Sequence, residues 1–248
     1  MLDVTDPARV HAAVAGHDVV VNCAAWTAVD AAESHEGEAF VVNAVGPANL
    51  ARAARASGAR LVQVSTDYVF EGNAARPYPE DAPVAPRSAY GRTKAAGEWA
   101  VRAETDDHLV VRTAWLYGAG GKCFPKTMAR LGAERDSVTV VDDQLGQPTW
   151  TVDLAALIVR LVAADAPSGT YHGTSSGEVS WFGFAQEVMR SAGLGTRVES
   201  TTSASFAAPA PRPAYSVLGH AALRSAGVEP IGDWAERWAV ASGPVLAG

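Results

Sequence analysis

Ser88-Ala-Tyr-Gly-Arg-Thr-Lys-Ala-Ala-Gly-Glu98 opens the segment that decides the fold of this chain of 248 residues. We predict a helix over Ala89–Arg102. A short apolar run, Arg60-Leu-Val-Gln-Val-Ser65, precedes it, and another, His108-Leu-Val-Val-Arg112, follows it. Apolar runs of this length bounded by polar residues are typical of buried strands. The middle of the chain therefore reads as strand, helix and strand.

The same alternation extends toward the amino terminus. His17-Asp-Val-Val-Val-Asn-Cys23 predicts a further strand, and Glu38–Ser57 has helical periodicity that ends at Gly58. Alternating strands and helices favour a parallel sheet covered by helices. Strands buried on both faces are continuously apolar, as these are. We therefore expect an α/β fold.

The pattern is less regular after Gly118. We predict further helices and strands, and a final helix that carries tryptophan, at Phe124–Glu134, Ser137–Val141, Asp153–Ala163, Gly169–His172, Ser180 to about Gly193 (with Ser180 as the N-cap) and Asp233–Ala241. The stretch Ser200–Pro213 is rich in Ser, Thr, Ala and Pro, which suggests an exposed connection.

Composition excludes several classes of protein. The formal net charge of −7 leaves no basic footprint for nucleic acid. Cys23 and Cys123 form neither a disulfide framework nor a metal-binding spacing, so we expect reduced thiols in a cytoplasmic protein and no metal site. No segment is long and apolar enough to predict a membrane span.

Tyr90 and Lys94 are the first candidates for chemistry. Residues four apart share one face of a helix. A free tyrosine hydroxyl has a pKa of about 10, and a nearby ammonium favours the phenolate and lowers that pKa. The pair is therefore a candidate proton donor or acceptor for a carbonyl/alcohol interconversion. An ordinary helix face remains the alternative.

Three strand ends supply further candidates, because ligands of open α/β sheets bind at the carboxyl ends of the strands. Asn22-Cys-Ala-Ala25 offers small residues beside which a flat cofactor can lie. Ser65-Thr-Asp-Tyr-Val-Phe70 offers hydroxyls for a substrate carbonyl, and Arg112-Thr-Ala-Trp-Leu-Tyr-Gly118 offers Trp115 for stacking. Tight helix packing, a capped turn and a core tryptophan are the respective structural alternatives.

These motifs together resemble a known family. A strand-end threonine followed by Tyr-x-x-x-Lys matches the extended short-chain dehydrogenases/reductases. The local strings, which run in order along the whole chain, closely resemble the dTDP-4-dehydrorhamnose reductase family: Leu2–Asp6, Asn22–Glu33, Ser65–Phe70, Tyr90–Lys94, Arg112–Gly118, Asp142–Thr149 and Arg212-Pro213 with Ser216.

The resemblance implies a Rossmann-like, doubly wound parallel sheet with a smaller C-terminal substrate-binding α/β region. Residues 1–118 plus about 150–175 would form the NAD(P)-binding domain, and about 119–149 plus 176–248 the substrate-binding region. Leu2–Asp6 is similar to the end of the family's third strand. We therefore expect the family's first, glycine-rich βαβ unit to be absent from this sequence.

The resemblance also implies an activity and a site. NADPH or NADH would reduce the 4-keto group of a dTDP-4-keto-6-deoxy sugar, giving dTDP-L-rhamnose from dTDP-4-dehydrorhamnose. The implied catalytic residues are Thr66, Tyr90 and Lys94. Tyr90 and Lys94 would also bind the cofactor, together with Asp3, Val4, Ala24 and Ala25. The implied substrate-binding residues are Val29, Asp30, Tyr68, Trp115 and Arg212, with Arg212 suited to the diphosphate.

Other readings remain open. We expect a nucleotide-sugar substrate, no nucleic acid and no membrane, with a homodimer as one candidate assembly. Related dehydratases carry Glu after Thr-Asp, where this chain has Tyr68. A 4-ketoreductase for another deoxysugar, a non-catalytic homologue such as the regulatory subunit of methionine adenosyltransferase, or an inactive fragment would fit many of the same motifs.

Overall fold

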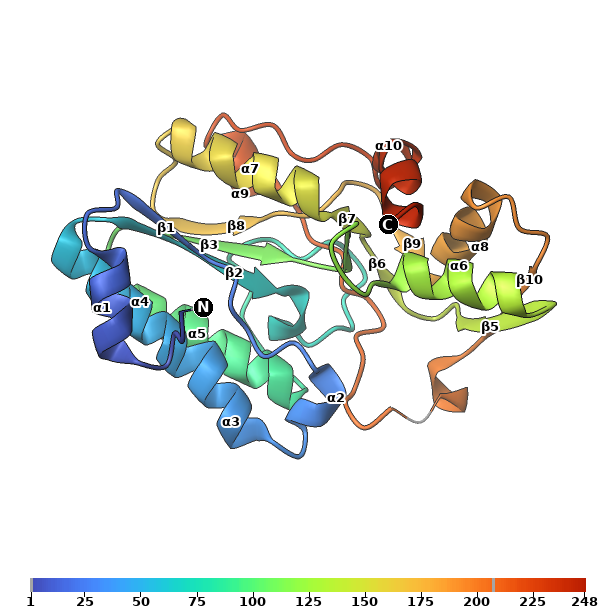
Figure 1. The fold of residues 1–248 in the computed structure, drawn as a ribbon, viewed down its shortest axis with the longest axis horizontal. Coiled ribbons are helices and arrows are strands. Elements are labelled where there is room, and N and C mark those ends of the chain that lie inside the picture. The colour runs from blue at the N-terminus through green and yellow to red at the C-terminus, as the bar shows by residue number, and fades with distance from the viewer. Residues whose placement is uncertain (1, 207) are drawn as a thin grey trace.

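A four-stranded parallel sheet is the centre of the computed structural model, which describes residues 2–206 and 208–248 (Figure 1). The strands lie in the order β1-β2-β3-β8, with all three neighbouring pairs parallel. Their bounds are β1 (Val19–Asn22), β2 (Arg60–Thr66), β3 (His108–Thr113) and β8 (Gly169–His172). The expected α/β fold with a parallel sheet is confirmed.

Helices cover both faces of this sheet (Figure 1). Because side chains alternate along a strand, Leu61 and Val110 point to one face, whereas Val62 and Val111 point to the other. The first face packs on α1 (Pro7–Val14), α4 (Gly46–Ser57) and α5 (Ala89–Glu104). The second packs on α7 (Thr151–Ala163) and on the segment around α9 (Ala221–Ser225). That segment thus joins the sheet core, although the sequence assigned 176–248 to the substrate region.

The predicted helix over Glu38–Ser57 is interrupted. It divides into α3 (Glu36–Phe40), a π-helical turn η1 (Val41–Val45) and α4. Gly58 ends α4 in the left-handed conformation at φ +73°, as its position predicted. The interruption coincides with long-range hydrogen bonds of Asn43, whose side-chain amide donates to the Trp26 carbonyl at 3.1 Å and to the Thr93 hydroxyl at 3.0 Å.

The predicted strand end at Leu2–Asp6 is wrong. Val4 and Thr5 form a turn. The Asp3 carboxylate accepts from the Thr5 amide at 2.9 Å and from the Thr5 hydroxyl at 2.7 Å, and such bonds favour a turn over a ladder. Asp6 then caps α1, a helix that the sequence analysis missed.

The half after Gly118 is a second layer of helices on short strands. The remaining elements, the first three of which precede Gly118, are α2 (Val29–Ala32), η2 (Asp67–Val69), β4 (Leu116–Tyr117), α6 (Phe124–Glu134), β5 (Ser137–Val141), β6 (Leu145–Gly146), β7 (Thr149–Trp150), β9 (Val179–Ser180), α8 (Trp181–Ser191), β10 (Arg197–Thr201), η3 (Ser203–Ser205) and α10 (Trp234–Leu246). The core of this layer is aromatic, with Tyr117, Phe184 and Trp238 buried together. No helix among the described residues is long and apolar enough to cross a membrane.

Candidate active site

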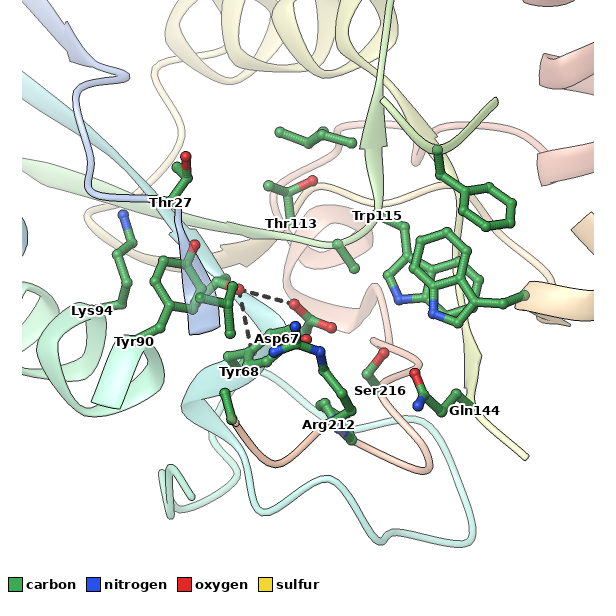
Figure 2. Close-up of a pocket in the computed structure, with 18 of the residues that line it drawn as sticks. Thr27, Asp67, Tyr68, Tyr90, Lys94, Thr113, Trp115, Gln144, Arg212 and Ser216 are labelled. Carbon is green, nitrogen blue, oxygen red and sulfur yellow. Dashed lines mark hydrogen bonds between the residues drawn. The ribbon is translucent and has the colours of Figure 1, made fainter. Parts of the chain in front are cut away.

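A cavity of about 1090 Å³ lies where the carboxyl ends of β1, β2 and β3 face the second half of the chain. Ligands of open α/β sheets bind at this edge. Its volume slightly exceeds the roughly 300–1,000 Å³ that is usual for small-molecule sites. Figure 2 shows side chains from both halves pointing into it.

Thr66, the last residue of β2, is buried at the floor of the cavity. Its hydroxyl donates to Asp67 Oδ1 at 2.9 Å and accepts from the Tyr68 amide at 3.2 Å. The second bond caps η2, so Thr66 does cap a turn, as the structural alternative expected. The Thr66 side chain also lies close enough to the Tyr90 phenol to lower its pKa. Thr66 therefore serves both the turn and the cavity.

Tyr90 reaches the same point from the first turn of α5. The Ser88 hydroxyl accepts from the Gly91 amide at 3.1 Å and caps this helix. A Cβ on Gly91 would overlap the Tyr68 carbonyl oxygen, so only glycine lets α5 lie this close to η2. The Tyr90 ring meets the Tyr68 ring edge-on, with centroids 5.5 Å apart. Cap and close packing together fix the phenol in the cavity.

The electrostatics of Tyr90 differ from the prediction. Burial raises the pKa of Tyr90 to about 12; the hydrogen bond with Thr66 opposes this, and the charge of Asp67 adds to it. Lys94 was expected to lower that pKa, but its Nζ donates to the Val64 carbonyl at 2.7 Å. Burial thus outweighs any effect of the ammonium, and Tyr90 keeps its proton at neutral pH.

Lys94 is not a solvated helix residue. It is only 5% exposed and lines the cavity. Burial lowers its pKa to about 8, against the opposing charge of Glu98. An ammonium held in this way can donate to a second partner in the cavity, because among the described residues it forms one hydrogen bond and has three protons.

A buried ion pair holds α5 against the sheet. Glu98 on α5 and Arg112 on β3 are 1% and 3% exposed and form two hydrogen bonds, of 2.9 and 2.8 Å. The Ser65 hydroxyl adds a third bond to Glu98 at 2.6 Å. Burial opposes ionisation, but these donors hold the pKa of Glu98 below its usual value. The pair fixes the helix of Tyr90 relative to the strand of Thr66.

The loops that face the sheet across the cavity contribute aromatic and cationic side chains (Figure 2). Trp115 has a φ of +47°, a strained conformation for a bulky residue, and stacks on Trp181 with ring centroids 3.5 Å apart. Arg212 forms a 2.8 Å ion pair with Asp30 of α2, and its Nη1 is buried without a hydrogen-bond partner among the described residues. Trp115 is thus a partly buried, stacked residue of the cavity wall, and Arg212 is partly exposed and paired.

The structure brings most of the predicted site residues together. The ones that line the cavity are Ala25, Val29, Thr66, Tyr68, Tyr90, Lys94, Trp115 and Arg212. Asp30 adjoins them through Arg212. Asp3, Val4 and Ala24 do not line it, so their cofactor role stays a prediction. No cluster of metal-binding side chains occurs among the described residues.

Asp67 and Trp181 are cavity residues that the sequence analysis did not select. Asp67 stands inside the quoted motif Ser65–Phe70, where a carboxylate next to the strand-end threonine was an available signal. Trp181 follows the predicted N-cap Ser180, but nothing in the sequence indicates that it meets Trp115.

The residues present fit the reactive end of a nicotinamide cofactor. The cavity places a buried ammonium, Lys94, one helical turn from a protonated phenol, Tyr90, next to the small residues Cys23 and Ala25. This donor set suits a ribose hydroxyl and a carbonyl oxygen, and the small side chains leave space for a flat ring.

Comparisons with known proteins agree with this site. Residues 1–242 match the family model described as RmlD substrate binding domain. The chain is 54% identical over 241 residues to a dTDP-4-dehydrorhamnose reductase of Streptomyces griseus, with 94% of this chain and 79% of that protein covered. It is 45% identical to the enzyme of that name from Mycobacterium tuberculosis, covering 96% and 81%.

Solved structures show the same likeness. A dTDP-4-dehydrorhamnose reductase from Clostridium acetobutylicum superposes with a TM-score of 0.94 at 43% identity, covering 97% of this chain and 86% of that one. A dTDP-4-dehydrorhamnose reductase from Bacillus anthracis in complex with NADP superposes with a TM-score of 0.94 at 40% identity, again covering 97% of this chain and 86% of that one. The family expected from the motifs is confirmed: this chain belongs to the dTDP-4-dehydrorhamnose reductase family.

Proposed function

We propose that the chain is an NAD(P)H-dependent 4-ketoreductase that converts dTDP-4-dehydrorhamnose to dTDP-L-rhamnose. The observation that carries the proposal is the convergence of Thr66, Tyr90 and Lys94 on the floor of one large cavity. Relatives that are 45–54% identical bear the reductase name, and a related structure contains NADP.

Tyr90 is the proton donor in this proposal. Its pKa of about 12 keeps the phenol protonated until a negative charge develops on the C4 oxygen of the sugar. The Thr66 hydroxyl holds the phenol in place and lies near the same oxygen. Lys94 holds the ribose of the cofactor and stabilises the phenolate that remains. The nicotinamide, when bound, supplies the hydride for C4.

The substrate binds where loops of both halves meet in the cavity. Val29, Tyr68 and Trp115 line the cavity around the position of the sugar. Arg212 would bind the diphosphate, since a guanidinium binds phosphate through two parallel hydrogen bonds. Its free Nη1 supports that role, and its pairing with Asp30 orients it.

A second candidate is a 4-ketoreductase for another deoxysugar. Relatives of similar identity bear other names, such as a dTDP-4-keto-6-deoxy-D-glucose reductase of Streptomyces niveus at 50% identity. The same catalytic residues would serve either sugar, so the difference must lie in the substrate side of the cavity. A non-catalytic homologue is the weaker alternative, because it has no use for a buried phenol and ammonium side by side.

Turnover is the direct test. The purified protein is mixed with NADPH or NADH and with dTDP-4-dehydrorhamnose or another dTDP-4-keto-6-deoxy sugar, and cofactor oxidation and the product are measured. We expect dTDP-L-rhamnose as the main product. Faster turnover of a different sugar would support the second candidate. Binding of the ligands without turnover would support a non-catalytic homologue. We also propose a cytoplasmic location and a homodimer; sedimentation of the protein tests the latter.

A further inference from the structure

Trp115 and Trp181 form a ring stack on the wall of the cavity. Their rings are nearly parallel, at an interplanar angle of 6° and with centroids 3.5 Å apart, so Trp181 covers one face of the Trp115 ring. Close face-to-face overlap is less favourable than an offset or edge-on pair. Trp115 also has a φ of +47°, which a bulky side chain rarely adopts. Local strain of this kind clusters at functional sites, so the arrangement requires an explanation.

Gly146 covers the opposite face of the same ring. A Cβ on Gly146 would lie 2.6 Å from Cζ2 and 2.7 Å from Nε1 of Trp115, and closer still to Cε2, which is bonded to both. Similar distances to three consecutive ring atoms place Gly146 above the ring rather than beside it. No atom of Trp181 is among the nearest to that position, so Gly146 lies on the face that Trp181 leaves open. Any side chain at position 146 would therefore displace the indole.

Trp115 thus meets the cavity with an edge of its ring, on the side away from Lys94 (Figure 2). Because both faces are covered, the indole cannot stack on a ligand ring, which is the role that the sequence suggested for it. Its Nε1–H has no acceptor among the described residues. An indole N–H only donates, and a tryptophan that is partly buried usually finds an acceptor for it. An oxygen of a ligand in the cavity can supply that acceptor.

We propose that Trp181 is a positioning residue that, with Gly146, holds Trp115 edge-on so that its indole N–H donates to a hydroxyl oxygen of the sugar. The inference rests on the function proposed above, in which Trp115 lies on the sugar side of the cavity. Trp181 acts on the sugar only through Trp115. A site that donates to a substrate hydroxyl rejects an analogue lacking it far more strongly than an apolar pocket does. The slot therefore favours a nucleotide sugar that keeps this hydroxyl over a more deoxygenated one.

Trp181→Leu is the first test, and calorimetry with dTDP-L-rhamnose and with dTDP, which lacks the sugar, measures it without turnover. We expect the affinity for dTDP-L-rhamnose to fall by on the order of 10-fold, the value of about one hydrogen bond. The affinity for dTDP should stay constant. Trp181→Phe keeps a ring against Trp115 and should bind both ligands almost as the wild type does. Equal losses for the two ligands in Trp181→Leu, or no loss, overturn the inference.

Gly146→Ala reaches Trp115 from its other face and leaves Trp181 in place. Its methyl group would overlap the indole, so we expect the same selective loss of affinity for the sugar ligand. Phe184→Leu is the matched control, because Phe184 is buried in the same aromatic core and packs on Phe124 but does not line the cavity. It should lower stability and leave both affinities unchanged. A selective loss in Phe184→Leu, or none in Gly146→Ala, overturns the inference.

Circular dichroism tests the slot in the free protein. Two indoles stacked this closely couple their electronic transitions and give a pair of bands of opposite sign in the ultraviolet spectrum. We expect this couplet in the wild type and in Trp99→Phe, since Trp99 is 58% exposed on α5, and its loss in Trp115→Phe and Trp181→Phe. A wild type without the couplet overturns the inference, even if Trp181→Leu fails to fold. Selective binding of dTDP-L-rhamnose through the slot in a protein that does not reduce dTDP-4-dehydrorhamnose counts against the proposed function alone.

Discussion

The two sides of the active-site cavity, the sheet side and the loop side, hold their residues by different means. Thr66 ends a strand paired on both sides, and Tyr90 and Lys94 lie on a helix that a buried ion pair fixes to the sheet. Trp115 and Arg212 come from loops and are held by ring stacking and by a half-exposed ion pair. Rigid elements give precise geometry, whereas loops can adjust to a ligand. The sheet side thus suits the chemistry, and the loop side suits recognition.

Tyr90→Phe should produce the largest effect and test the chemical side of this comparison. The ring remains packed edge-on to Tyr68, and only the hydroxyl is lost. We expect kcat to fall by ~10²–10⁴-fold, the usual contribution of a general acid. Cofactor affinity, measured by calorimetry, should stay nearly constant. Turnover at the wild-type rate would remove Tyr90 from the mechanism.

Glu98→Ala should show how firmly the sheet side is fixed. The substitution leaves the Arg112 guanidinium buried without its carboxylate, which typically costs ~3–5 kcal/mol. Urea unfolding at neutral pH measures the loss. The matched control is Glu104→Ala in the same helix, whose partner Arg52 is 56% exposed. For Glu104→Ala we expect a loss of about 0–1 kcal/mol in the free energy of unfolding. Equal losses would mean that the buried pair has no special role.

The sheet side is also the part that the sequence predicted well. The strands Arg60–Thr66 and His108–Thr113 are apolar on both faces, so their position follows from local pattern alone. The spacing of Tyr90 and Lys94 correctly predicted that they share one face of a helix, because helical geometry depends only on local sequence. The interruption at Val41–Val45 was missed, since it depends on hydrogen bonds of Asn43 to distant residues.

Long-range contacts explain what the sequence could not show. Arg212 and Asp30 are separated by 182 positions and were selected separately, without any sign that they pair. The pKa of Tyr90 was predicted to fall because of Lys94, yet burial, which depends on the whole fold, raises it. The sequence placed Asp67 beside the strand-end threonine, but its burial and its unpaired Oδ2 depend on the whole fold.

Arg212→Ala tests the recognition side. A hydrogen bond to a charged group contributes about 1.5–3 kcal/mol. We therefore expect KM for the nucleotide sugar to rise by roughly 10–100-fold, with little change in KM for the cofactor. Arg130→Ala, on the exposed face of α6, controls for the loss of one positive charge. An equal rise in both KM values would show that Arg212 does not discriminate between the two ligands.

The smallest expected effect compares two serine N-caps, one in each half. Ser88 caps α5 through the Gly91 amide at 3.1 Å, and Ser180 caps α8 through the Gly183 amide at 3.0 Å. Replacing either by alanine should cost ~1 kcal/mol in the free energy of unfolding. The kinetic consequences should differ, because the first turn of α5 carries the proton donor Tyr90, whereas α8 begins with Trp181, which stacks on Trp115.

We therefore expect Ser88→Ala to lower kcat and Ser180→Ala to raise KM for the nucleotide sugar, each by a few-fold at matched loss of stability. Steady-state kinetics at a temperature well below both unfolding transitions makes the comparison. Ser180 also donates to Asp142 at 2.5 Å, so Ser180→Thr, which keeps the hydroxyl, separates the cap from a loss of packing. The same kinetic change in both alanine variants would mean that the two halves respond as one unit, and the division between chemistry and recognition would then fail.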